Sequence, residues 1–277
     1  MLRTGVGLVL TLCGLAAVLL ALLYANQRSL IYLPARLDPA RFAQLVRASL
    51  GERATILAPF DAVVVEPPAT VPARATVILF HGNAGLGIER SYLVPVCATR
   101  GLRLVLAEYP GYGGRAGEPS ERALVADGEA LYAEVLRRYR GAPVLLAGES
   151  LGTGVAVQVA TGREPPPARL VLLTPFLSLA ETAARAYPYL PARYLVRDRF
   201  DSAGRLPRYR GPVAILVAGE DEVVGAAQGR ALVALARARG ETAYVELPDG
   251  GHNGWTAFAS DAQWTELLGA PPLATGR

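Results

Sequence analysis

One serine of this chain stands in a pattern that can make it a nucleophile. Residues 148–152, GESLG, match G-x-S-x-G, which places a serine on a sharp turn between a strand and a helix. Glycine is needed on both sides because a Cβ there would collide with the strand or the helix. With 29 glycines in the chain a bare match is weak evidence, but the apolar run PVLLA directly before it predicts the required strand. We therefore predict that Ser150 is the nucleophile.

A serine hydroxyl is a poor nucleophile unless a base takes its proton, and the chain has only two histidines. His81 lies in HGNAG, before the serine, and His252 lies in DGGHN, after the last apolar run. Folds that use this turn carry serine, acid and histidine in that chain order. The order selects His252 as the general base, and we expect His81 to bond the backbone of its own loop.

A carboxylate must orient the base and stabilise its charged form. The acidic residues between the serine and the histidine include Asp198, Asp201, Glu220, Asp221, Glu222 and Asp249. Residues 220–222 directly follow the apolar run VAILVA, so they lie at the strand end where functional groups of parallel sheets gather. We choose Asp221 as the acid, with Glu220 and Glu222 as close alternatives.

Acyl transfer also needs donors for the negative oxygen of the tetrahedral intermediate. The loop at residues 81–85 follows a predicted strand and can offer the backbone N–H of Asn83. The N–H of Leu151, next after the nucleophile, can offer the other. Removing one such donor typically costs about 2.7–4 kcal/mol of transition-state stabilisation.

The elements that must position these groups follow from alternating patterns after about residue 27. Nearly continuous runs of Val, Ile and Leu, typical of strands buried on both faces of a parallel sheet, occur at residues 76–80, 102–108, 143–147, 170–173, 213–218 and 243–247. A shorter pair within residues 54–67 predicts antiparallel strands at the sheet edge.

Helix-type stretches separate the runs, at residues 120–139, 151–161, 226–239 and 255–268, and Ser120 is placed to cap the first of them. Alternation of strands and helices predicts βαβ units with right-handed crossovers. The fold class is therefore α/β, with a mostly parallel, doubly wound sheet covered by helices on both faces.

The N-terminal residues 5–24 carry no charge and would form a helix about 30 Å long, enough to cross the hydrocarbon core. The alternative is a cleaved signal peptide, which needs a shorter apolar run and small residues at its end, where this chain has Leu22-Leu23-Tyr24. We expect an uncleaved membrane anchor over residues 1–26 and a catalytic domain over 27–277. The side of the membrane that the domain occupies is left open.

Composition narrows the partners. The net charge is +4, all 28 basic residues are Arg, and they are spread along the chain without a nucleic-acid motif, so no nucleic-acid partner is expected. The two cysteines, Cys13 and Cys97, lie in the apolar N-terminal stretch and in the predicted domain, which disfavours a disulfide. No metal-type spacing occurs, so neither metal nor cofactor is expected.

Together these motifs resemble the α/β-hydrolase-domain proteins of the Bem46 type, which are grouped with serine aminopeptidase-like hydrolases. The resemblance rests on HGNAG, YPGYGGRAGEPSE, GESLG, TPFLSL, GEDEVV and GGHN, in this order, and on RSLIYLP after the apolar stretch. It covers the chain from residue 27 onward. It implies an α/β-hydrolase fold behind a membrane segment, Ser150, Asp221 and His252 as catalytic triad, and the Asn83 loop as oxyanion donor.

The chain departs from the family pattern at three positions near these motifs. Ala218 stands where the family tends to have Gly, Gly225 where it tends to have Pro, and Gly254 where it often has Asp. The first two flank the predicted acid, so they bear on the choice of Asp221.

The expected reaction is hydrolysis of a carboxylic ester or thioester through an acyl-enzyme on Ser150, with lipid-derived acyl groups as substrates. Two alternatives remain, a serine peptidase acting on short peptides and a non-catalytic membrane-tethered scaffold. Residues 177–212, with seven Arg and four Tyr, form either a small cap over the site or a solvated connection. The oligomeric state is not predicted.

Overall fold

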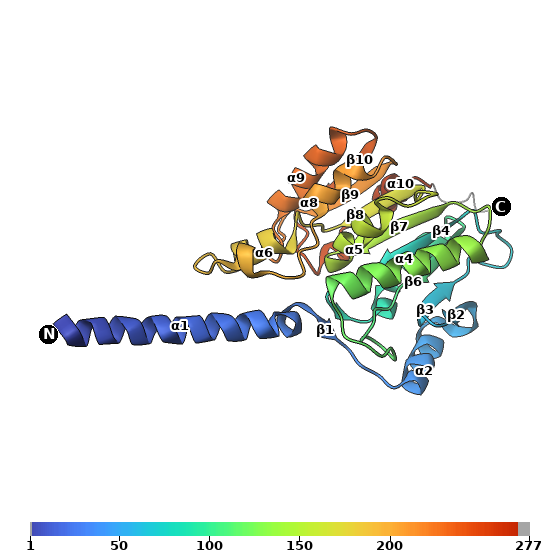
Figure 1. Cartoon of the computed structure of the whole chain (residues 1–277). Helices are drawn as coiled ribbons and strands as arrows, with labels where there is room; N and C mark the ends of the chain where they lie inside the picture. Colours follow the sequence, from blue (N-terminus) through green and yellow to red (C-terminus); the bar gives the residue numbers. More distant parts are fainter. Residues whose placement is uncertain (1, 271–277) are drawn as a thin grey trace.

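An eight-stranded sheet forms the centre of the molecule (Figure 1). The computed structural model describes residues 2–270. The strands of the sheet are β2 (Ala54–Leu57), β3 (Ala62–Val65), β4 (Ala75–Phe80), β6 (Leu102–Leu106), β7 (Val144–Glu149), β8 (Arg169–Leu173), β9 (Val213–Ala218) and β10 (Thr242–Leu247). Their order is β10-β9-β8-β7-β4-β6-β3-β2.

The predicted α/β class and the mostly parallel sheet are confirmed. Strands β4, β6, β7, β8, β9 and β10 pair in parallel, whereas β2 and β3 are antiparallel and form one edge. All side chains of β4 are buried, and they alternate between two apolar cores: Ile78 and Phe80 face one, Val77 and Leu79 the other. Burial on both faces is the reason that this run has no polar side.

Helices cover each face of the sheet. The first core is closed by α4 (Glu121–Arg138), α5 (Leu151–Ala160) and α9 (Ala226–Arg237). The second is closed by α2 (Pro39–Leu50), α3 (Leu93–Ala98) and α10 (Asp261–Leu268). Ser120 caps α4 as expected, since its side-chain oxygen accepts the N–H of Ala123.

Two of the regions that cover the second core differ from the sequence prediction. The single helix expected over residues 255–268 is wrong: a short 3-10 helix, Trp255–Ala257, is followed by α10, and Ser260 with Gln263 forms a capping box that starts the new helix. Helix α2 was not predicted, although Asp38 and Pro39 are typical of a helix start.

The N-terminal helix α1 runs unbroken over Leu2–Ile31 and extends away from the domain (Figure 1). Its segment Gly5–Ile31 is long and apolar enough to cross a membrane. The helix thus continues beyond the apolar run of residues 5–24, and its last turns reach the domain. There β1 (Leu33–Pro34) pairs in parallel with β5 (Ala84–Gly85).

The stretch between β8 and β9 contains three short helices, α6 (Leu179–Ala186), α7 (Ala192–Leu195) and α8 (Ser202–Arg205), and the 3-10 helix Leu206–Arg208. In Figure 1, α6 and the segment after it project from the domain on the side from which α1 extends.

Candidate active site

Ser150 occupies the turn between β7 and α5, with the positive φ of 51° that few non-glycine residues adopt. Its N–H donates to the carbonyl oxygen of Leu173, which fixes the turn against β8. The neighbouring glycines are required by close packing. A Cβ on Gly148 would collide with the backbone of Gly152, and a Cβ on Gly152 would collide with the carbonyl of Phe80.

His252 reaches the serine from the loop after β10. Its Nε2 lies 2.8 Å from the Oγ of Ser150, so the hydroxyl can donate its proton to the ring. The side chain of His252 is almost fully buried, which fixes the ring and keeps bulk water from its Nδ1. This arrangement suits an imidazole that accepts a proton from the serine and returns it to a leaving group.

Asp221 lies behind the imidazole, with its Oδ2 2.8 Å from Nδ1 of His252. Its other oxygen, Oδ1, accepts the backbone N–H groups of Val223, Val224 and Gly225 at 3.0, 2.8 and 3.2 Å. Burial acts to raise the pKa of Asp221, but the hydrogen bond and charge of His252 and the backbone N–H groups outweigh it and hold this pKa below its usual range. The carboxylate is therefore ionised when the imidazole becomes charged.

The alternative acids lie elsewhere. Glu222 is exposed and accepts the backbone N–H of His252 at 3.1 Å, while Glu220 is exposed. Asp198 is bonded to Arg28 and Tyr32. Among the three neighbouring acids, only Asp221 contacts the imidazole in the described part of the chain.

The structure explains why Gly225 stands where the family tends to have proline. Its N–H is one of the donors to Asp221, and a proline, which has no N–H, could not donate there. Its φ is +87°, and an added Cβ would press on the guanidinium of Arg185. The glycine therefore fits both the carboxylate and its neighbour.

The two predicted oxyanion donors lie beside the serine. Asn83 and Leu151 line the same cavity as Ser150, and within residues 2–270 neither backbone N–H donates to a protein acceptor. The loop of Asn83 is held from two sides: its side-chain amide donates to the carbonyl oxygen of Ile31 at 3.0 Å, and its own carbonyl accepts the hydroxyl of Tyr112 at 2.7 Å.

His81 does not reach the serine. It is fully buried, with Nδ1 2.8 Å from the carbonyl oxygen of Gly82 and Nε2 3.2 Å from Glu108. Glu108 also accepts the N–H of Gly87 at 3.1 Å. The pair thus braces the start of the loop that carries Asn83.

Glu149, the residue directly before the serine, forms a cluster with Arg90 and Tyr92 that the sequence did not predict. Its carboxylate accepts Nε and Nη2 of Arg90 at 3.1 and 2.9 Å and the hydroxyl of Tyr92 at 2.7 Å. Burial, and then the neighbouring Glu149, raise the pKa of Tyr92 well above its usual range, so its phenol stays a donor. Arg90 also donates to the carbonyl of Leu86, which ties the serine turn to the loop opposite. Because Tyr92 and Arg90 lie 57 and 59 residues before Glu149, no local sequence pattern predicts this cluster.

A cavity of about 290 Å³ opens beside Ser150. No described residue of its lining is charged; the lining consists of Leu30, Ile31, Asn83, Ser150, Leu151, Phe176, Leu179, Thr182, Ala183, Ala186, Tyr187, Val196, Val223 and Val224. Such a lining suits an aliphatic group of the substrate.

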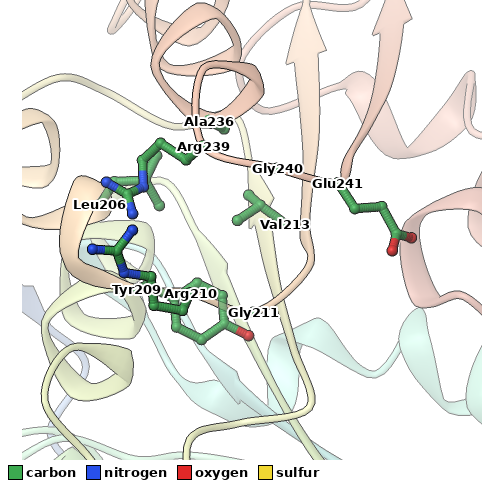
Figure 2. A pocket seen from close by; sticks show the side chains of 9 residues that line it. All are labelled: Leu206, Tyr209, Arg210, Gly211, Val213, Ala236, Arg239, Gly240 and Glu241. Carbon is green, nitrogen blue, oxygen red and sulfur yellow. The ribbon is translucent and has the colours of Figure 1, made fainter.

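Figure 2 shows a separate depression that does not belong to this site, lined by side chains that include Arg210 and Arg239. It lies at Val213, the first residue of β9, whereas the groups near Ser150 follow the carboxyl ends of the strands. Its volume of about 10 Å³ gives room for a single water. Within residues 2–270, no three His, Cys, Asp or Glu side chains are grouped so that they could hold a metal ion.

Comparison with known proteins gives a consistent family. A family model described as "Serine aminopeptidase, S33" matches residues 71–200. An uncharacterized protein of Mycobacterium tuberculosis strain CDC 1551 is 34% identical over 244 residues, which cover 86% of this chain and 84% of the relative. A lysophosphatidylserine lipase of Danio rerio, ABHD12, is 34% identical over 182 residues, but the match spans only 48% of that lipase.

Solved structures share the fold. An esterase of Pyrococcus furiosus has a TM-score of 0.64 with 14% identity, covering 86% of this chain and 96% of the esterase. A monoacylglycerol lipase of Paleococcus ferrophilus has a TM-score of 0.55 with 21% identity, covering 75% of this chain and 98% of the lipase.

Proposed function

Because this chain belongs to the serine aminopeptidase (S33)-like α/β-hydrolases, in the Bem46-like branch that includes the ABHD12 lipases, we propose that it is a membrane-anchored serine hydrolase that cleaves acyl esters or thioesters. The observation that carries the proposal is the hydrogen-bonded chain Asp221–His252–Ser150 at the edge of an uncharged cavity. Residues 1–26 would be the anchor and residues 27–277 the catalytic domain.

The geometry supports a two-step reaction. In the first step Oγ of Ser150 attacks the substrate carbonyl carbon while Nε2 of His252 takes the hydroxyl proton. His252 then gives this proton to the leaving alcohol or thiol as the carbon–leaving-group bond breaks. A water attacks the acyl-enzyme, His252 takes its proton and returns it to Ser150, and the carboxylic acid is released. Asp221 stays ionised and stabilises the imidazolium in both steps.

The N–H groups of Asn83 and Leu151 would bind the negative oxygen in the tetrahedral states. Their proposed role is supported by their place beside Ser150 and by the lack of a protein acceptor for either N–H in the described residues.

The cavity favours esters over peptides. An aminopeptidase must bind the charged amino terminus of its substrate, and a buried ammonium needs a carboxylate partner. No described residue lining the cavity is acidic, and most are aliphatic. The names of the relatives point the same way, since ABHD12 and the Paleococcus protein are described as lipases.

A fluorophosphonate probe tests the nucleophile directly. The wild-type chain in detergent should form a covalent adduct on Ser150, and Ser150→Ala should not label. Absence of labelling in a folded wild-type chain would favour a non-catalytic scaffold. A panel of aliphatic esters, thioesters and short peptides then separates esterase from peptidase: hydrolysis of the peptides alone would contradict the proposed substrate class.

A further inference from the structure

The end of the N-terminal helix forms part of the wall of the active-site cavity. Leu30 and Ile31, the last two residues of α1, line the cavity of Ser150 together with Ala183 of α6. The end of α1 therefore contributes to the active-site cavity itself and does not only connect the domain to the helix.

Polar contacts fix this end of α1 against the segment around α7. Gln27 accepts the N–H of Arg197 at 2.7 Å, and Arg28 bonds the carboxylate of Asp198 at 2.9 Å. Asp198 is buried and also accepts the hydroxyl of Tyr32 at 3.0 Å. These hydrogen bonds and the ion pair therefore hold the last turns of α1 against the α6–α7 segment.

A second cavity of about 210 Å³ lies between the same two segments. It adjoins the cavity of Ser150, because the two share five lining residues, Leu30, Ile31, Ala183, Tyr187 and Val196. From there it runs along α1 to Leu20, a distance of about 15 Å for ten residues of helix. Its lining is apolar except for Gln27 and the tyrosine hydroxyls.

The far end of this groove lies within the stretch of α1 that is long and apolar enough to cross a membrane. Leu20 and Leu23 belong to the apolar stretch of α1, and the α6–α7 segment beside them exposes three large side chains: Tyr187 is 57% exposed, Tyr189 97% and Tyr194 82%. Tyrosines with a free apolar body and a polar tip are typical of the interface between membrane and water.

We propose that the two cavities form one groove, which we define as the α1–α6/α7 groove, that it binds the acyl chain of a long-chain ester substrate, and that it opens toward the leaflet that holds α1. The inference rests on the proposed function and adds the substrate class and its direction: the ester carbonyl lies at Ser150 and the tail follows α1 back toward the bilayer. The two cavities separately are at or below the lower end of the roughly 300–1,000 Å³ common for ligand sites, whereas one continuous groove suits a long chain.

The test narrows the groove without touching the hydrogen-bonded chain at Ser150. Ala183 lies where the two cavities meet, so Ala183→Phe should block the tail but leave room for a short acyl group. Ala184→Phe is the matched control, because its position on the same helix lines neither cavity. The full-length chain in lipid nanodiscs is assayed with p-nitrophenyl butyrate and p-nitrophenyl palmitate.

We expect Ala183→Phe to lower the palmitate-to-butyrate ratio of kcat/KM at least tenfold, and Ala184→Phe to leave the ratio unchanged. Ala192→Phe, in the distal cavity only, is the second variant and should shift the ratio in the same direction; it decides alone if Ala183→Phe does not fold. Unchanged ratios in the folded variants overturn the groove assignment. Failure of the proposed function looks different, since the wild type would then neither cleave butyrate nor label with fluorophosphonate.

Discussion

At the scale of single residues, the carboxylate of Asp221 accepts more hydrogen bonds in fixed positions than a carboxylate exposed to water would. One oxygen faces the imidazole of His252 and the other accepts three consecutive backbone N–H groups. These bonds orient the carboxylate and favour its ionised form, which is the form needed to stabilise a charged imidazole. The turn after β9 thus fixes the acid before substrate arrives.

The lowered pKa of Asp221 predicts a pH dependence of stability. A carboxyl group whose pKa is lower in the folded than in the unfolded chain contributes stability above its unfolded value, about 3.9, and this contribution is lost as the pH falls through the folded value. Between about pH 5 and pH 3 the wild type should therefore lose more free energy of unfolding than Asp221→Asn. Urea unfolding in detergent micelles measures both, and parallel losses would contradict the assignment.

At the scale of elements, the turn between β7 and α5 brings three backbone segments so close that only glycine fits. The sequence pattern predicted this turn correctly, because strand, glycines and helix are neighbours along the chain. The strands were predicted for a similar reason, since each carries its own apolar run. The break before α10 was missed because the apolar residues on either side of Ser260 continue a helical pattern, and only the capping box ends it.

The site residues also divide into those that the sequence predicts and those that only the structure identifies. The chain order of Ser150 and His252 could be read from the sequence. The sequence also favoured Asp221, but only the positions in space separate it from Glu220 and Glu222. The Glu149–Arg90 pair and the contact of α1 with the Asn83 loop join residues far apart, so no local pattern predicts them. The catalytic roles themselves stay predictions until labelling and substitution test them.

The packing at this turn predicts that Gly152→Ala is strongly destabilising. The new methyl group would overlap the carbonyl of Phe80, so α5 or β4 must shift, and overpacking of this kind typically costs about 1–3 kcal/mol or more. Gly254→Ala is the control, because no heavy atom lies within 4 Å of the added Cβ. Thermal unfolding should separate the two variants, and equal stability would show that the turn can relax.

At the scale of the whole molecule, the chain consists of a layered α/β domain and one long helix that extends from it (Figure 1). The last turns of that helix contact α7 and line the cavity of Ser150. Cleavage of residues 1–26 as a signal peptide would keep Leu30 and Ile31 but remove Leu20, Leu23 and Tyr24, which line the second cavity.

The proposed anchor predicts that residues 1–26 remain on the mature protein. Membranes from cells that express the chain should hold it through alkaline carbonate extraction, and intact mass spectrometry should show the uncleaved N-terminal stretch. A mature chain beginning near Tyr24 or later, released in soluble form, would contradict the anchor.

The parallel pairing of β1 with β5 links the backbone directly after α1 to the loop that carries Asn83. The N–H of Leu33 donates to the carbonyl of Asn83 at 2.9 Å, and the amide of Asn83 donates back to Ile31. The proposed anchor and the proposed oxyanion loop are thus joined by one short piece of main chain. A foreign transmembrane segment should therefore be joined to this enzyme upstream of Gln27, so that these hydrogen bonds are retained.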